Sequence, residues 1–212
     1  MNIMQQLKER TRDHHNNAEG QEFQRQLASG ELSRELYAAY LSQLYLIHEL
    51  LEKRLRESEK ALPSIGSVFS ENQMQVPFLE QDLEFFGINV QGIRPEAATK
   101  ALMDKIETAA IECPFALLGF HYVLLGSKHG GKFIAHNLQI KYHLNEGRGA
   151  IYFDPYGTNF QQIWKSFAAG FNELPLTQSD ETAAIKAAAD TFEGIASLNQ
   201  ELLKHSADAV QR

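Results

Sequence analysis

The sequence predicts an all-α, multi-helical protein, because apolar residues recur at helical spacing along most of the chain and strand signals are almost absent. Between residues 32 and 61, apolar side chains follow one another at steps of three and four, the spacing of one helix face: Leu36, Tyr40, Leu44, Ile47, Leu51 and Leu55. The segment Ile151-Tyr152-Phe153 is too short to found a sheet.

The remaining periodic segments predict further helices, several of which begin at a proline. We expect them over residues 77–87, over 95–111, from Pro114 through a long apolar stretch, over 160–171 and over 179–205. The loops expected at 63–72 and 145–158 are too short to be domain linkers. We therefore expect one domain over residues 1–212, built from layered helices.

Composition narrows the class of protein and its compartment. Hydrophobic residues make up 43% and charged residues 22% of the 212 residues, which is ordinary for a globular protein. The net charge of −7 argues against nucleic acid as the main partner. No stretch approaches the roughly 18 apolar residues of a membrane span, and the N-terminus lacks the apolar core of a secretory signal. With one cysteine, Cys113, the chain forms no intramolecular disulfide, so we expect a cytoplasmic protein.

A polar segment near the N-terminus holds a candidate metal ligand. His15 and Glu19 are four residues apart, so their side chains are neighbours on a helix. A metal-bound histidine usually donates its second ring N–H to a carboxylate or a carbonyl, and Glu19 is suitably placed to accept it. His14 points about 100° away from His15 around a helix, so at most one of them serves a given site. Taken alone, the segment is more often a solvated start of a helix.

A glycine cluster interrupts an apolar helical stretch. Gly126, Gly130 and Gly131 lie between apolar segments, and each glycine inside a helix costs about 1 kcal/mol relative to alanine. Because glycine has no Cβ, a flat ligand can rest against the main chain there, and the helix can bend. A planar macrocycle on a kinked helix explains the cluster. An ordinary turn between two helices explains it equally well.

Haem is such a macrocycle, and its two propionates need cations at the rim of the site. Lys8 precedes His15 by about two helical turns and lies on about the same face, and Lys165 lies on the amphipathic helix that carries Trp164. Either lysine is long enough to reach a propionate, although a lysine on a helix is more often simply solvated.

Taken together, these motifs resemble the haem oxygenase family over nearly the whole chain. The resemblance rests on several spaced motifs in the right order: Leu7–Thr11 followed by His15–Glu19, Leu44-Tyr45 with Leu51-Glu52, Leu79–Gly87, Tyr122 with Gly126-Ser127 and Gly130-Gly131, and Phe160–Lys165. It implies one helical domain with haem held between a proximal helix and a kinked, glycine-rich distal helix.

The resemblance also implies roles for individual residues. His15, supported by Glu19, is the axial iron ligand, and Lys8, Tyr122 and Lys165 hold the propionates or line the pocket. Ser127 and the backbone at Gly126 and Gly130 order water on the catalytic side, and Gly131 belongs to the same cofactor-binding glycine cluster. Haem is then both cofactor and substrate. O₂ and electrons from an external reductase or ferredoxin open the ring to biliverdin, with release of CO and iron.

The chain departs from the family pattern at several positions. Ser127 stands where animal-type members carry an aspartate that anchors a distal water network, and a Gly-Ser pair at this point is typical of the bacterial type. Leu125 and His129 replace a glutamate and an apolar residue. Gln161 stands where animal members have a lysine that contacts a propionate.

His129 leaves a second function open. As a sixth ligand it would give a bis-histidine haem, which is typical of a non-catalytic carrier or sensor; as a surface residue beyond the kink, the interpretation we favour, it has no such role. A helical enzyme of similar fold with another ligand is a third interpretation. We assign no role to His121, His136 and His143.

Overall fold

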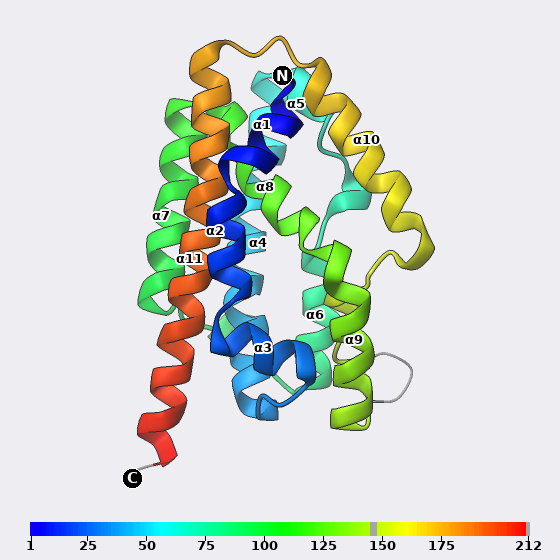
Figure 1. Cartoon of the computed structure of the whole chain (residues 1–212), viewed down its shortest axis with the longest axis vertical. Helices are drawn as coiled ribbons and strands as arrows, with labels where there is room; N and C mark the ends of the chain where they lie inside the picture. The colour runs from blue at the N-terminus through cyan, green and yellow to red at the C-terminus, as the bar shows by residue number, and fades with distance from the viewer. Residues whose placement is uncertain (145–147, 211–212) are drawn as a thin grey trace.

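The periodic segments are helices in the structure, a computed structural model that describes residues 1–144 and 148–210 (Figure 1). Its α-helices are α1 (Ile3–Arg10), α2 (Arg12–Glu19), α3 (Glu22–Ser29), α4 (Arg34–Ala61), α5 (Pro63–Gly66), α6 (Val76–Phe85), α7 (Ala97–Glu112), α8 (Leu117–Gly126), α9 (Lys128–Tyr142), α10 (Phe160–Glu173) and α11 (Gln178–Val210). Short 3₁₀ turns are η1 (Glu71–Gln73), η2 (Val90–Gly92), η3 (Pro114–Ala116), η4 (Ile151–Phe153) and η5 (Gly157–Asn159). No strand occurs within these described ranges, so the all-α prediction is confirmed.

Long helices frame the molecule, and α8 runs through its centre. Helix α11 packs along α7 and α8, and α4 packs against α6, α7 and α8 (Figure 1). Because α8 is apolar on all sides, it is stable only when surrounded, and eight of its residues are buried. Gly119 lets α11 approach α8 closely, since a Cβ there would overlap the carbonyl of Ala184. The buried side chains of all these helices form one connected core.

The chain breaks its helical path at Ser127, as the glycine cluster predicts. Helix α8 ends at Gly126, α9 begins at Lys128, and the two helices run in different directions (Figure 1). The turn η4 lies against α9 at this break. Asp82 of α6 fixes η4 by accepting hydrogen bonds from the backbone N–H groups of Ile151 at 2.9 Å and Tyr152 at 2.8 Å.

A second break, which the sequence analysis did not predict, separates α1 from α2. Thr11 has φ −105° and ψ 5°, outside the helical range, and its buried hydroxyl donates to the carbonyl of Leu7 at 2.7 Å. Lys8 and His15 therefore lie on two helices, α1 and α2, and not on one helix as expected. Ala18 is the one buried residue of α2.

None of the described helices combines the length and apolarity that a bilayer span requires.

His121, on α8, makes stability depend on pH. It is 1% exposed, and Nε2 lies 2.9 Å from Oε1 of Gln73. Burial lowers the pKa of His121 from 6.5 to about 3. Because the pKa of His121 is lower in the folded state, its contribution to stability is fully present above the unfolded-state pKa of about 6.5. This contribution is lost as pH falls from about 6.5 to about 3.

We predict that His121 makes the free energy of unfolding fall by roughly 1.4 kcal/mol per pH unit inside this window. Chemical denaturation at pH 7.0 and at about pH 4.5 measures the slope. His121→Gln should make the measured slope shallower by about this amount, whereas His136→Gln, at an exposed position, should leave it unchanged. An equal slope in all three proteins would contradict the assignment.

Gly131 offers a second test, because α9 meets η4 there without space for a side chain. A Cβ on Gly131 would overlap the carbonyl of Phe153, whereas a Cβ on neighbouring Gly130 would meet nothing within 4 Å. We predict that Gly131→Ala destabilises the fold by about 1–3 kcal/mol, the usual cost of overpacking. Gly130→Ala should be neutral or slightly stabilising. Thermal unfolding measures both, and equal melting temperatures would contradict this packing.

Candidate functional site

A cavity of about 540 Å³ lies between α2 and the broken helix α8–α9. Helix α2 contributes one wall and α8–α9 the facing wall, while parts of α3, α4, α10, α11 and η4 close the ends. The lining residues are Lys8, Thr11, Arg12, His15, Ala18, Glu19, Gln24, Leu27, Tyr40, Leu44, Tyr122, Val123, Leu124, Gly126, Ser127, His129, Gly130, Ile134, Tyr152, Phe153, Trp164, Phe192 and Ile195. Most of these side chains are apolar or aromatic, as is usual for a site that takes a large flat ligand.

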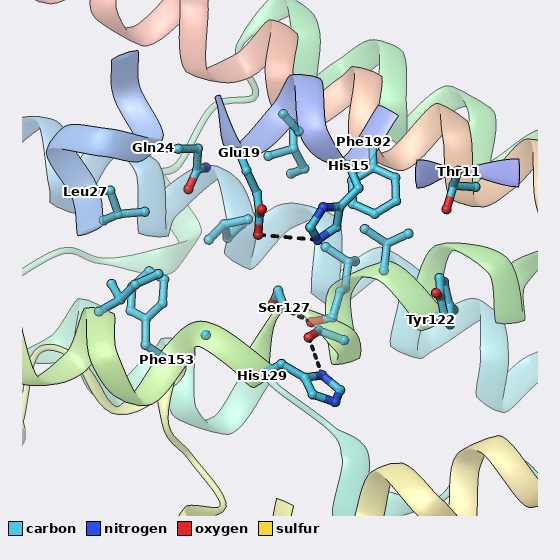
Figure 2. Close-up of a pocket in the computed structure, with 18 of the residues that line it drawn as sticks. Thr11, His15, Glu19, Gln24, Leu27, Tyr122, Ser127, His129, Phe153 and Phe192 are labelled. Atoms are coloured by element: carbon cyan, nitrogen blue, oxygen red, sulfur yellow. Dashed lines mark hydrogen bonds and ion pairs between the residues drawn. The ribbon is translucent and has the colours of Figure 1, made fainter. Parts of the chain in front are cut away.

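His15 stands on the α2 side of the cavity and faces the break at Ser127 (Figure 2). Its side chain is 48% exposed, its Nε2 lies 3.3 Å from Oε1 of Glu19, and its ring meets the ring of Phe192 edge-on at 5.5 Å. The predicted neighbour relation between His15 and Glu19 is therefore present. The ion pair uses Nε2 and leaves Nδ1 for another partner, so a metal that takes Nε2 requires Glu19 to move away.

His14 points elsewhere, as the helix geometry predicts. Its Nδ1 lies 3.2 Å from Oε1 of Glu193 on α11. The two adjacent histidines therefore have different partners: His14 ties α2 to α11, and His15 is left for the cavity.

The opposite wall of the cavity includes a stretch with little or no side chain. Gly126, Ser127 and Gly130 line it. A Cβ on Gly126 would lie 3.4 Å from the Trp164 ring, an ordinary contact, whereas a Cβ on Gly130 would meet nothing within 4 Å. Gly130 is thus the position where a missing side chain leaves room in the cavity. The Ser127 hydroxyl donates to the carbonyl of Leu124 at 2.8 Å.

Two residues of the predicted set lie outside the cavity lining. Gly131 is buried against the Phe153 carbonyl, so its glycine serves helix packing. Lys165 is exposed on α10, whereas its neighbour Trp164 lines the cavity. Tyr122 and Lys8 line the cavity as predicted, and Arg12 joins Lys8 at its rim. The i, i+4 spacing of Lys8 and Arg12 is the signal in the sequence that could have revealed Arg12.

His129 is among the cavity-lining residues, but its ring is held by partners of its own. Its Nδ1 is 2.9 Å from the Gly126 carbonyl, and its ring packs edge-on at 4.8 Å against both Phe160 and Trp164. Figure 2 shows the imidazole directed away from His15. In this conformation the imidazole does not face His15 across the cavity.

Tyr152 and Phe153 were missed by the sequence analysis, which treated their segment as a loop. Both are buried and line the cavity. Only their connection to Asp82, about 70 residues earlier in the chain, brings them there.

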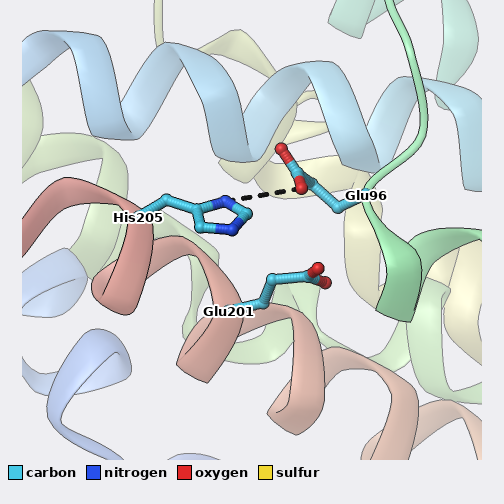
Figure 3. A group of neighbouring side chains, drawn as sticks. All are labelled: Glu96, Glu201 and His205. Carbon is cyan, nitrogen blue, oxygen red and sulfur yellow. Dashed lines mark ion pairs between the residues drawn. The ribbon is translucent and has the colours of Figure 1, made fainter. Parts of the chain in front are cut away.

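A separate group of potential metal ligands lies at the start of α7: Glu96, Glu201 and His205, with ligand atoms within 4.8 Å of one another (Figure 3). Glu201 accepts hydrogen bonds from the N–H groups of Ala97 at 3.2 Å and Ala98 at 2.8 Å, so it caps α7. His205 Nδ1 lies 3.5 Å from Glu96. Helix capping and one ion pair account for this arrangement.

Several known proteins with related sequences or structures are described as heme oxygenases. Heme oxygenase 1 of Synechocystis sp. is 25% identical over 91% of this chain and 81% of its own length. The crystal structure of heme oxygenase-1 from Synechocystis sp. in complex with heme matches this chain with a TM-score of 0.89 at 23% identity. The match covers 100% of this chain and 96% of that one. Heme oxygenase-2 from Synechocystis sp., in complex with heme and NO, matches with a TM-score of 0.90 at 25% identity, over 99% and 88%.

The chain also matches a model of a whole protein family. The family model described as Heme oxygenase covers residues 1–204. Because this match extends over nearly the whole chain, the chain belongs to the heme oxygenase family.

Proposed function

We propose that this chain cleaves haem oxidatively to biliverdin, with release of CO and iron. The observation that carries the proposal is the pair of facing walls: the imidazole of His15 on α2 and the bare main chain around Gly130 on the other side of one cavity. Family membership and relatives named heme oxygenase support the same activity.

The residues present fit haem. The volume of about 540 Å³ is in the range of small-molecule sites, and the walls are mainly apolar. A histidine beside a carboxylate is a typical iron-ligating arrangement. The space at Gly130 is one that any larger residue would fill. The departure at Gln161 does not disturb the cavity, because Gln161 is exposed on α10.

Haem supplies the redox-active iron and the ring that is cleaved. His15 would hold the iron from the α2 side, and Glu19, which pairs with Nε2 in this structure, would have to release that nitrogen if the iron takes it. Gly126 and Gly130 let the macrocycle lie against main chain, so its position relative to α8–α9 is set without a side chain between them. Ser127 lines the cavity, and its Oγ, whose hydrogen is donated to the Leu124 carbonyl, would accept a hydrogen bond from an ordered water there. The apolar side chains on both walls exclude bulk water.

Lys8 and Arg12 are our candidates for the propionate-binding cations. Both line the cavity and stand one helical turn apart across the bend at Thr11. Arg12 adds a planar, bidentate donor for a carboxylate. Lys165 retains a role only if its exposed side chain reaches over Trp164 to the rim.

The competing function, a bis-histidine carrier or sensor, needs His129 on the iron. Its imidazole is held by the Gly126 carbonyl and by two aromatic rings. No observation in the described part of the chain favours that arrangement, so we retain the oxygenase.

Two further expectations belong to this proposal. The electrons come from an external reductase or ferredoxin, since haem cleavage consumes electrons that amino-acid side chains do not supply. The single cysteine, Cys113, which forms no intramolecular disulfide, is consistent with the reducing cytoplasm.

The turnover assay tests the function directly. Haemin is added to the purified chain, then a reductant in air, and the visible spectrum is followed. We expect the Soret band to decay while a biliverdin band grows. A stable low-spin spectrum would instead indicate a carrier, and the absence of any Soret shift on adding haemin would contradict haem binding altogether.

The axial ligand has its own test with a matched neighbour. His15→Ala should lower haem affinity by at least about 100-fold, because the loss of a residue that only hydrogen-bonds a metal ligand already costs up to about 100-fold. Added imidazole should restore the ferric spectrum of this variant. His14→Ala, which removes only the ion pair with Glu193, should keep the wild-type spectrum. If instead His14→Ala loses the spectrum and His15→Ala keeps it, the ligand is misassigned.

A further inference from the structure

One side of α9 is exposed although it carries large apolar side chains. Its exposed positions recur at steps of four and three, the spacing of one helix face: His129, Phe133, His136 and Ile140. Two exposed lysines adjoin this row, Lys132 next to Phe133 and Lys141 next to Ile140. These six residues are here called the α9 outer face.

The other sides of α9 already have partners. Gly130 and Ile134 line the cavity. A second side packs into the protein through buried residues: Gly131, Ala135, Leu138 and Tyr142. Figure 1 shows α9 at the edge of the molecule. The α9 outer face is therefore the side on which another molecule can contact this helix.

Phe133 and Ile140 form the apolar part of this face. They are 63% and 56% exposed. Only Met1 and Ile111 are comparable among the large apolar residues of the described chain. Phe133 and Ile140 stand two helical turns apart, about 10 Å, so a single partner can cover both. A pair of apolar side chains with charged neighbours is typical of a protein interface, which has an apolar centre and a polar rim.

The charge of the α9 outer face is opposite to that of the whole chain. The chain has a net charge of −7, whereas α9 contains no acidic residue. The exposed charged side chains of α9 are Lys132 and Lys141, since its third lysine, Lys128, is buried. Exposed lysines elsewhere pair with carboxylates, as Lys100 does with Asp104 at 2.9 Å. Among the described residues, no carboxylate lies within 4.0 Å of the amines of Lys132 and Lys141.

Charge decides between two kinds of occupant for this face. A second copy of the chain would bring the same patch of both subunits together, as two-fold interfaces do, and would set lysines against lysines. An acidic protein would meet opposite charge, which favours encounter and fixes orientation. The proposed function requires an external source of electrons, so an acidic electron carrier meets both conditions.

The α9 outer face begins at the cavity. His129, its first residue, also lines the cavity, and its ring packs edge-on at 4.8 Å against Trp164, another lining residue. Gly130 and Ile134 place the cavity on the adjoining side of the same helix. A protein on the outer face would therefore lie about one helix diameter, roughly 10 Å, from the cavity. Because electron transfer slows steeply with distance, an electron carrier needs such a position.

We propose that the α9 outer face docks the electron donor, an acidic protein that carries an iron–sulfur cluster or a flavin. The inference rests on the proposed function and names the partner that it needs. Phe133 and Ile140 form the apolar centre of the contact, and Lys132 and Lys141 attract the acidic rim of the donor. The donor is oxidised as it passes one electron at a time to the haem iron, which is reduced, and no covalent bond forms between the two proteins.

The test compares protein donors with a small reductant on the full chain loaded with haemin. Ascorbate reaches the cavity by diffusion, whereas reduced [2Fe–2S] ferredoxin and reduced flavodoxin, both acidic proteins, have to dock. The rate of biliverdin formation gives KM and kcat for each protein donor. In wild type this KM should rise about tenfold between about 20 mM and about 200 mM NaCl, because salt screens the attraction. The ascorbate-driven rate should change little.

Charge reversal separates docking from catalysis. Lys132→Glu/Lys141→Glu should raise KM for ferredoxin about tenfold at low salt and make it nearly independent of salt. The Soret band, the ascorbate-driven rate and kcat at saturating ferredoxin should keep their wild-type values, since neither lysine lines the cavity. Lys53→Glu reverses an exposed lysine on α4 and should leave KM unchanged.

Apolar variants test the centre of the contact. Phe133→Gln/Ile140→Gln introduces good helix formers and should raise KM for ferredoxin about tenfold at both salt concentrations, because salt does not screen the loss of an apolar anchor. Ile111→Gln removes an 82% exposed side chain on α7 and should leave KM unchanged. Circular dichroism checks that each variant is folded.

The outcomes distinguish this inference from the function on which it rests. A wild-type chain that forms no biliverdin with ascorbate would end the proposed function, and this inference with it. Ascorbate-driven turnover without turnover from either protein donor, or with a KM that none of the α9 variants changes, would overturn the docking surface alone. Sedimentation tests the other occupant: a wild-type dimer that Phe133→Gln/Ile140→Gln converts to monomers would place a second copy on this face and overturn the donor.

Discussion

The break at Ser127 is the constraint on which the site depends. Because α8 is surrounded by other helices, its direction is fixed, and α9 can leave that direction only where the main chain is free to bend. The break places Gly130 against open space and Gly131 against the Phe153 carbonyl. The two adjacent glycines therefore do different things: Gly130 leaves space in the cavity, and Gly131 lets η4 pack against α9.

Much of this could be predicted from local sequence. The helices follow from apolar spacing, and the contact between His15 and Glu19 follows from their separation of four residues. The glycine cluster predicted the kink, but it did not predict that Gly130 and Gly131 have different surroundings. Gly131 packs a neighbouring segment rather than the ligand, because the position of η4 depends on Asp82, far away in the sequence.

The rest depends on contacts that no local pattern encodes. His48 and Tyr152 are 104 residues apart and meet only in the folded chain. A lysine at the start of a helix is ordinarily solvated, so the burial of Lys128 had no signal in the sequence. The bend at Thr11 likewise has no local pattern behind it: the Leu7 carbonyl accepts both the hydroxyl and the N–H of Thr11 there. Arg12, rather than Lys165, stands at the cavity rim as a result.

The weak anchoring of α2 has a consequence for the catalytic cycle. With Ala18 as its one buried residue, this helix has little hydrophobic burial of its own to keep it docked. Contacts made through a bound molecule would then supply a large share of what holds the helix against the remainder of the protein. The opened tetrapyrrole would accordingly leave as α2 loosens, in one coupled event. The motion of α2, and not a separate gate, would then govern the exit of the product.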